Sequence, residues 1–252
     1  MLGLSLSLPR AAIARVRFDP LSLFADGSAG GVYDPSDPAS IAATSDGAAP
    51  AAIDGPVGLI RDASPRGNAL TQATDAARPM LRRDVGGRTW LDFDGSGFLA
   101  AASADFAFTD AFVVAAALRF EGSAAFAAFI GTYAVGSGWD VGVQGGVPRA
   151  AARGAATIDT GSAGFADMTG TDATLVVEVS RGAITRSVNG ARVTTAGNWT
   201  PATTQTPFAL GQRGNDGSSR FVGRVYGLIV LGRAATAAER GLIEAWLAER
   251  GR

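Results

Sequence analysis

The chain has 252 residues, of which 47% are hydrophobic, and its 22 basic and 23 acidic residues give a net charge of −1. This balance argues against nucleic acid or an anionic membrane surface as the main partner. The sequence contains no His, Cys or Lys, which excludes disulfides, Cys and His metal sites, His-dependent triads and Schiff-base lysines. The remaining chemistry uses carboxylate, guanidinium, hydroxyl, amide and aromatic groups, and a metal would be a hard cation such as calcium.

The first residues alternate between leucine and small residues, which predicts a strand rather than a helix. This strand either belongs to the main sheet or forms an arm that pairs with a neighbouring subunit. We treat residues 1–24 as an N-terminal anchoring arm and residues 25–252 as one domain. The arm would contact its partner through Leu2, Leu4, Leu6 and Leu8.

No export signal is evident, because the N-terminus lacks a basic region and Pro9 interrupts its apolar run. The apolar run at 111–118 is too short to span a bilayer. We therefore expect folding in the cytoplasm and no membrane insertion.

Most of the chain after Trp90 consists of short apolar or alternating segments separated by turn residues. Asn189-Gly190, between two alternating segments, is a strong β-hairpin signal. Regularly spaced short strands without an internal repeat predict an antiparallel sandwich. The expected strands lie within 110–120, 124–133, 138–144, 173–180, 183–195, 207–213 and 219–233.

One amphipathic helix is predicted over residues 236–250. Thr236 and Glu239 form a capping box at its start, since each side chain can satisfy a free backbone N–H group. Its apolar stripe should cover the sandwich through Leu242, Ile243, Trp246 and Leu247.

Four segments in order, "IRDASPRGNALTQATDAARPML", "TWLDFDGSGFL", "RSVNGARV" and "FVGRVYGLIVLGRAATAAERGLIEAWL", cover about residues 55–250. Together they resemble the laminin-G-like, concanavalin A-like lectin domains. This resemblance implies an all-β, antiparallel jelly-roll β-sandwich with a C-terminal amphipathic helix.

The segment "GVYDPSDPASI" (31–41) is similar to jelly-roll spike or fibre proteins of tailed phages and gene transfer agents. This likeness implies a virion surface protein, assembled in the bacterial cytoplasm, that attaches a particle to host capsular or lipopolysaccharide glycan. Its partners would then be virion structural proteins. A homo-oligomer, trimer or pentamer, would add avidity to a weak sugar site.

A sugar site needs polar groups for hydroxyls and an aromatic face for C–H groups. The polar loop "GNDGSSR" (214–220) supplies the former, although a solvated turn has the same composition. The candidate carbohydrate-binding residues are Tyr133, Trp139, Asp140, Trp199, Asn215, Asp216 and Arg220.

Glucanases of this fold carry E-x-D-x-x-E on one strand, a motif that this sequence lacks, and we expect no enzymatic activity. The alternative is a glycan hydrolase that uses two carboxylates from Asp92, Asp94 and Asp140. The segment "DFDGSG" (92–97) matches the first positions of an EF-hand loop, but Ser103 replaces its final Glu, so calcium stays open. A further alternative is a structural spike-base or decoration protein that binds other virion subunits.

Overall fold

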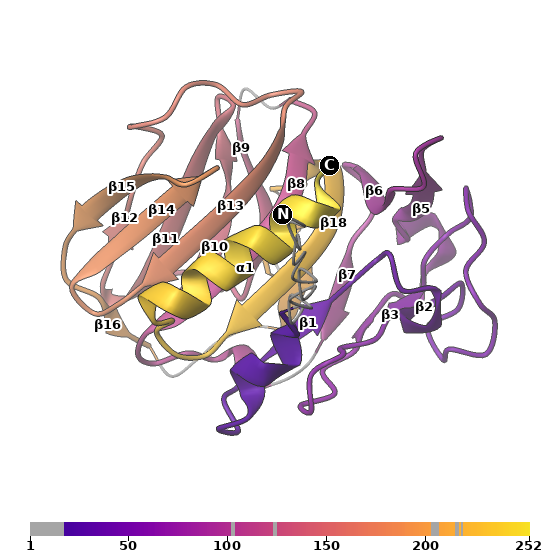
Figure 1. Cartoon of the computed structure of the whole chain (residues 1–252). Helices are drawn as coiled ribbons and strands as arrows, with labels where there is room; N and C mark the ends of the chain where they lie inside the picture. Colours follow the sequence, from indigo (N-terminus) through magenta and orange to yellow (C-terminus); the bar gives the residue numbers. More distant parts are fainter. Residues whose placement is uncertain (1–17, 102–103, 123–124, 203–206, 215–216, 218) are drawn as a thin grey trace, which may run out of the picture.

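The computed structural model describes residues 18–101, 104–122, 125–202, 207–214, 217 and 219–252. Two antiparallel sheets pack face to face as a β-sandwich, and one α-helix near the C-terminus crosses the outer face of the first sheet (Figure 1). The predicted all-β, antiparallel jelly-roll sandwich with a C-terminal helix is confirmed. The four leucines of the predicted arm (Leu2, Leu4, Leu6 and Leu8) lie outside the described residues.

The first sheet has eight strands in the order β15-β14-β13-β8-β18-β6-β5, and β1 also pairs with β18. Its strands are β1 (Gly30–Tyr33), β5 (Met80–Arg83), β6 (Thr89–Asp94), β8 (Phe112–Phe120), β13 (Asp172–Val179), β14 (Ala183–Val188), β15 (Ala191–Ala196) and β18 (Val222–Leu231).

The second sheet has ten strands in the order β12-β11-β10-β9-β17-β7-β4-β3-β2, and β16 also pairs with β11. Its strands are β2 (Ile41–Ala42), β3 (Leu59–Ile60), β4 (Leu70–Thr71), β7 (Leu99–Ala101), β9 (Phe126–Gly131), β10 (Gly138–Gln144), β11 (Val147–Ala156), β12 (Ile158–Asp159), β16 (Thr200–Pro201) and β17 (Phe208–Leu210). Short 3₁₀ helices complete the described elements: η1 (Pro20–Phe24), η2 (Pro38–Ser40), η3 (Asp75–Ala77) and η4 (Ala104–Phe106).

The main core lies between the two sheets and is rich in aromatic rings. Phe106 and Phe208 stack with their centroids 3.8 Å apart, and Trp139 packs 5.1 Å from Phe112. All four side chains are almost fully buried. Burial of such large apolar surfaces is the dominant stabilising contribution in a sandwich of this kind.

A second, smaller core lies between the first sheet and helix α1 (Ala237–Arg250). The predicted capping box is present, because Thr236 Oγ1 accepts from the Glu239 N–H and the Glu239 carboxylate accepts from the Thr236 N–H. Ile243 and its neighbours Trp246 and Leu247 are buried as predicted, but Leu242 is 45% exposed. The prediction for Leu242 is wrong, because the helix presents a narrower apolar stripe to the sheet.

The 3₁₀ helix η1 belongs to this second core. Leu23 and Phe24 are buried in it beside Trp246. The folded domain thus includes η1, which falls within the segment assigned to the arm from sequence.

The predicted hairpin at Asn189-Gly190 joins β14 to β15, with Val188 opposite Ala191. Both turn residues have positive φ angles, 49° and 86°, as the two-residue turn of a twisted hairpin requires. The hairpin prediction is confirmed.

The segment that follows β3 is held by one carboxylate. Asp62 accepts hydrogen bonds from the backbone N–H groups of Val32 (2.9 Å), Ser64 (2.8 Å) and Asn68 (2.9 Å). The residues that carry part of the lectin-like resemblance therefore fasten this loop to β1, which is a structural role.

Candidate functional site

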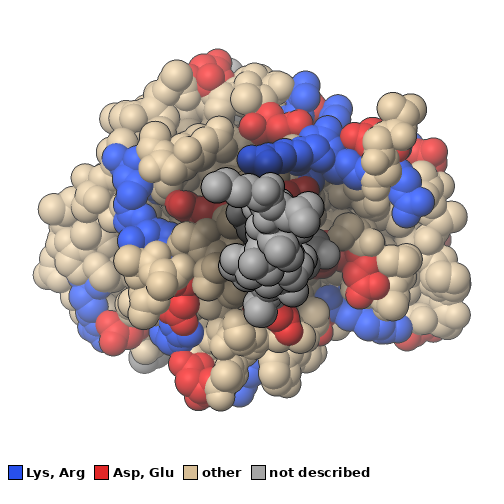
Figure 2. Space-filling model, in the orientation of Figure 1, with Lys and Arg blue, Asp and Glu red and all other residues tan. Residues whose placement is uncertain are grey.

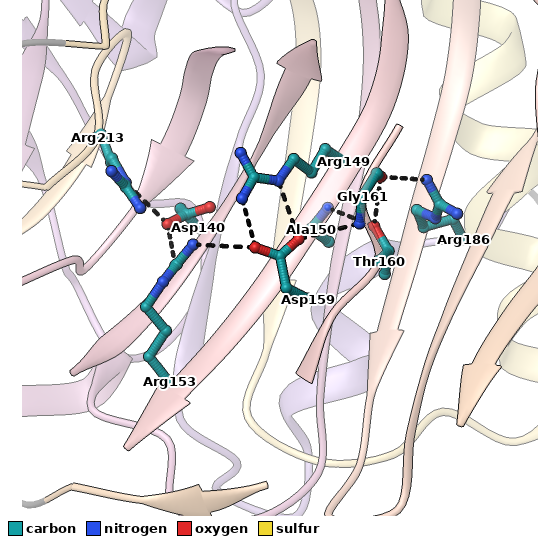
Figure 3. A network of polar contacts seen from close by, with 9 residues as sticks. All are labelled: Asp140, Arg149, Ala150, Arg153, Asp159, Thr160, Gly161, Arg186 and Arg213. Atoms are coloured by element: carbon teal, nitrogen blue, oxygen red, sulfur yellow. Dashed lines mark hydrogen bonds and ion pairs between the residues drawn. The ribbon is translucent and has the colours of Figure 1, made fainter. Parts of the chain in front are cut away.

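The outer face of the second sheet carries a cluster of arginines at β9–β12. Along β10, Trp139 and Val141 point into the core, so the intervening Asp140 points to the outer face. Along β11, Ala150 and Ala152 belong to the core, which places Arg149 and Arg153 on the outer face. Figure 3 shows Arg149, Arg153, Arg213, Asp140 and Asp159. We call these five residues, with the rings of Phe126 and Tyr133, the arginine face.

Asp140 is the buried centre of this face. Its Oδ2 accepts hydrogen bonds from Arg153 Nη1 and, at 3.0 Å, from Arg213 Nε. Its side chain is 0% exposed, and Oδ1 has no hydrogen-bond partner among the described residues. Burial raises the pKa of the Asp140 carboxyl, while the two guanidinium groups act in the opposite direction.

Asp159 continues the network toward the edge of the sheet. Its two carboxylate oxygens accept hydrogen bonds from Nε and Nη2 of Arg149. The backbone N–H of Gly161 donates a further hydrogen bond at 3.0 Å. Arg153 Nη2 lies 3.7 Å from Asp159 Oδ2, so Arg153 bridges both carboxylates. Burial acts to raise the pKa of Asp159, but the hydrogen bonds from Arg149 and Gly161 outweigh it and lower the pKa.

Two aromatic rings fix the guanidinium planes. The Arg213 guanidinium carbon lies 3.5 Å from the Tyr133 ring centroid, and that of Arg149 lies 4.7 Å from the Phe126 centroid. A guanidinium stacked on a ring loses less conformational entropy when it binds a planar group. The face therefore offers pre-oriented N–H donors.

A fourth arginine lies beneath this edge of the sandwich. Arg186, on β14, is 1% exposed and donates to the carbonyls of Pro148, Gly161 and Ala163. Burial lowers the pKa of Arg186, and Asp159 acts against this. The side chain thus joins the two sheets through backbone carbonyls.

Two of the candidate sugar platforms are buried in the core. Trp139 and Trp199 are 0% and 1% exposed, and their indole N–H groups donate to Phe106 O and Arg153 O. Their prediction as sugar-stacking rings is wrong, because neither ring presents a face to solvent. Tyr133 does belong to the arginine face, with Arg213 stacked on it.

The other predicted site residues are distributed as follows. Asp140 is covered by Arg153 and Arg213, so it positions these two groups. Arg220 lies elsewhere: it donates to Ser96 O (2.9 Å) and to Gly217 O (3.1 Å). Asn215 and Asp216 lie outside the described residues.

The carboxylates considered for hydrolysis do not form a pair with Asp140. Asp92 is on β6 of the first sheet and accepts from Trp90 Nε1 (3.3 Å), whereas Asp140 is on the outer face of the second sheet. Asp94 caps a turn through Ser96 and Gly97. Within the described residues no three acidic side chains lie together as a metal site.

A hollow lies beside α1, with a volume of about 460 Å³. Small residues on one side of the helix, Ala245 and Ala248, leave space against β13 and the β14–β15 turn. Asp172 and Glu244 both line it. The surrounding face of the molecule intermixes acidic and basic side chains (Figure 2), and no helix in the described part of the chain could cross a bilayer.

No protein-family model matches the chain, and no curated protein matches its sequence. Solved structures match its fold. A GH54 α-L-arabinofuranosidase soaked with a cyclic sulfate inhibitor aligns with a TM-score of 0.61 and 13% identity, over 92% of this chain and 66% of that one. Botulinum neurotoxin type C, whose cell entry depends on interaction with two ganglioside molecules, aligns with a TM-score of 0.56 and 10% identity, over 75% of this chain and 48% of that one.

Domain 4 of AbnA, a GH43 extracellular arabinanase from Geobacillus stearothermophilus, in complex with arabinotriose, aligns with a TM-score of 0.51 and 17% identity, over 66% of this chain and 81% of that one. At these identities the likeness shows a shared fold. It is a fold that glycan-binding β-sandwich domains use.

These structures correct one expectation. We expected a protein without enzymatic activity because a glucanase motif is missing. Structures of glycoside hydrolases, including the GH54 enzyme, share this fold, so the missing motif does not exclude enzymatic activity. The expectation is therefore overturned.

Proposed function

We propose that the chain is a glycan-binding β-sandwich whose arginine face holds the sugar. The observation that carries the proposal is the row of guanidinium groups stacked on Tyr133 and Phe126. Sugar oxygens accept hydrogen bonds from such planar donors, and the aromatic edges offer contact for C–H groups. The shared fold with a domain solved in complex with arabinotriose supports this proposal.

The proposal for the role of the whole protein rests on the sequence resemblance at residues 31–41. We propose that it attaches a phage-like particle to host surface polysaccharide from the virion surface, as an oligomer bound to other virion proteins. The alternative role, a spike-base or decoration protein, needs the same anchoring but no sugar. Anchoring by Leu2, Leu4, Leu6 and Leu8 stays a prediction.

The binding proposal is tested by isothermal titration calorimetry against host capsular and lipopolysaccharide glycans. Wild type is compared with Arg213→Gln and with a control, Arg82→Gln, because Arg82 lies on β5 of the first sheet, where it pairs with Asp54. We expect saturable binding by wild type and by the control, and weaker binding by Arg213→Gln. Equal affinities for all three proteins would remove the arginine face from the proposal.

Particle attachment is tested by deleting residues 1–17, which spares the buried Leu23 and Phe24 of η1. We expect that the shortened protein is not incorporated into particles. Those particles should then adsorb poorly to the host. Normal incorporation of the shortened chain would contradict the anchoring role of the leucines.

Glycan cleavage is a second candidate function, favoured by two carboxylates that line one hollow. Asp172 is held by Tyr226 Oη (2.7 Å) and Arg88 Nη1 (2.8 Å), while Glu244 accepts only from Ser187 Oγ (3.1 Å) among the described residues. Glycosidases use such a pair, one group as acid and one as base or nucleophile. Release of reducing ends that Glu244→Gln abolishes would support this function, and wild type without release would remove it.

A further inference from the structure

We propose that the arginine face selects a saccharide that carries a carboxylate, such as a uronic acid unit. This inference rests on the proposed glycan-binding function and names the chemical class of its ligand. It is carried by the charge balance of the network in Figure 3, by one set of N–H donors that the network leaves free, and by the burial of the charges.

The network holds more positive than negative charge. Arg149 and Arg153 bind the two carboxylates, Asp159 and Asp140, and Arg186 joins the network through Gly161 (Figure 3). These three arginines therefore exceed the two carboxylates by one positive charge, in a chain whose net charge is −1.

The two carboxylates are each shared between two arginines. Asp140 serves both Arg153 and Arg213, and Asp159 serves both Arg149 and Arg153. Among the described residues the buried Arg186 donates hydrogen bonds only to carbonyl oxygens, and its guanidinium carbon lies 5.4 Å from the Phe165 ring centroid. Carbonyl dipoles bind its Nη1 and Nη2 groups but do not cancel its charge.

Burial makes this excess effective. Arg186 is 1% exposed, and the side chains of Arg153 and Arg149 are 11% and 19% exposed. Charges in such surroundings are screened less than charges on an open surface. An anion placed on the face would thus feel a stronger attraction than one beside an isolated surface arginine.

Arg149 offers the donors for such an anion. Its Nε and Nη2 both bind Asp159, and no hydrogen bond within the described residues uses the N–H groups of Nη1. The ring of Phe126 holds the guanidinium plane. The floor beside it is made of small residues, Gly142 and Ala151, so no bulky side chain of the floor competes for the space.

The test compares two ligands that differ only in charge: an oligogalacturonide and the same oligosaccharide with its carboxyl groups reduced. Affinity is measured by isothermal titration calorimetry at low and high salt. We expect the acidic form to bind about tenfold more tightly, since a charge-assisted hydrogen bond contributes roughly that factor. The preference should shrink at high salt.

Three variants locate the effect. Arg149→Gln should lose most of the preference for the acidic form, whereas Arg82→Gln should keep it. Arg149→Lys retains the charge and should keep part of the preference, which separates charge from loss of structure. Thermal unfolding of each variant identifies any that fails to fold, and Arg213→Gln then replaces it in the comparison.

The outcomes distinguish this inference from the function on which it rests. Equal affinity for both oligosaccharides overturns the acidic preference and leaves glycan binding intact. The same holds if only neutral glycans bind in the titrations against capsular and lipopolysaccharide glycans. Absence of binding to any glycan overturns both. A preference that survives Arg149→Gln and Arg213→Gln together places the acidic site elsewhere and also overturns the inference.

Discussion

Arg186 and Pro148 belong to different sheets, and the guanidinium of Arg186 donates a hydrogen bond to the Pro148 carbonyl. The same guanidinium reaches Ala163 O at 2.8 Å. One buried side chain therefore closes the edge of the sandwich where β14 lies beside β11 and β12.

Replacement of Arg186 by Met should destabilise the fold. The apolar side chain can fill part of the space, but the carbonyls of Pro148 and Ala163 lose their donor. An unsatisfied buried polar group costs about 1–3 kcal/mol, and we expect a loss of about 2–4 kcal/mol in the free energy of unfolding. Urea unfolding measures it. The control is Arg192→Ala, which breaks an exposed pair with Glu178 and should cost less than about 1 kcal/mol. An equal loss of stability in the two variants would contradict the proposed role of Arg186.

Asp140→Asn keeps the shape of the side chain and removes its charge. Arg153 and Arg213 would then lie at a buried site without their shared carboxylate. Breaking a buried ion pair from one side costs about 3–5 kcal/mol, and chemical denaturation should show a loss of that order. The matched exposed change, Asp54→Asn beside Arg82, should cost less than about 1 kcal/mol. A stable Asp140→Asn protein would mean that the carboxylate is not needed to hold the two arginines.

The stability that the capping box at the start of α1 contributes should depend on pH through the ionisation of Glu239. Hydrogen bonding from Arg233, with help from the Thr236 N–H and against burial, lowers the pKa of Glu239 from 4.5 to about 2. Because the folded pKa is depressed, the stabilisation is complete above 4.5 and is lost as the pH falls to about 2. The difference in unfolding free energy between wild type and Glu239→Gln should be constant near neutral pH and shrink across this window. A difference that does not change with pH would contradict the role of the ionised carboxylate.

Trp139→Phe tests the correction made for the sugar platforms. The variant loses the hydrogen bond to Phe106 O (3.0 Å) and leaves space in the core. We expect a lower free energy of unfolding by about 1–3 kcal/mol. Glycan affinity measured by calorimetry should stay unchanged, since the ring has no contact with solvent. A large loss of affinity in a protein that remains folded would restore Trp139 as a sugar platform.

Strands with strong local patterns were predictable from sequence. Residues 138–144 form β10 as predicted, and the Asn189-Gly190 turn sets the register of the β14–β15 hairpin. The capping box of α1 was predictable for the same reason, since its hydrogen bonds join residues three apart. Local rules were sufficient where the partners are neighbours in the chain.

Strand β11 was missed, and with it two of the three arginines of the arginine face. The segment 147–156 is rich in Ala, contains Pro148, and has Val147 as its only β-branched residue, whereas strands favour such residues. Its strand conformation comes from pairing with β10, which is tertiary context. Arg149 and Arg153 therefore had no visible place on a face, although their spacing of four residues fits a strand.

The error at Trp139 could have been avoided from sequence. Trp139, Val141 and Val143 alternate, so the tryptophan shares the core face with the two valines. Asp140 and its neighbours at every second position had to lie on the other side. The aromatic side chain of Trp139 had suggested a sugar platform, although the alternation along the strand already indicated that this residue belongs to the core.

The carbonyl acceptors around Arg186 affect which substitutions this sequence can accept during evolution. A side chain that binds backbone oxygens does not constrain the residue types that carry them. Diverged copies could therefore change positions 148 and 163 widely, provided that the long cationic donor at position 186 and the left-handed turn at Gly161 (φ 56°) persist. Distant relatives would then share this closure of the sandwich edge while showing little identity along the strand and loop that it holds.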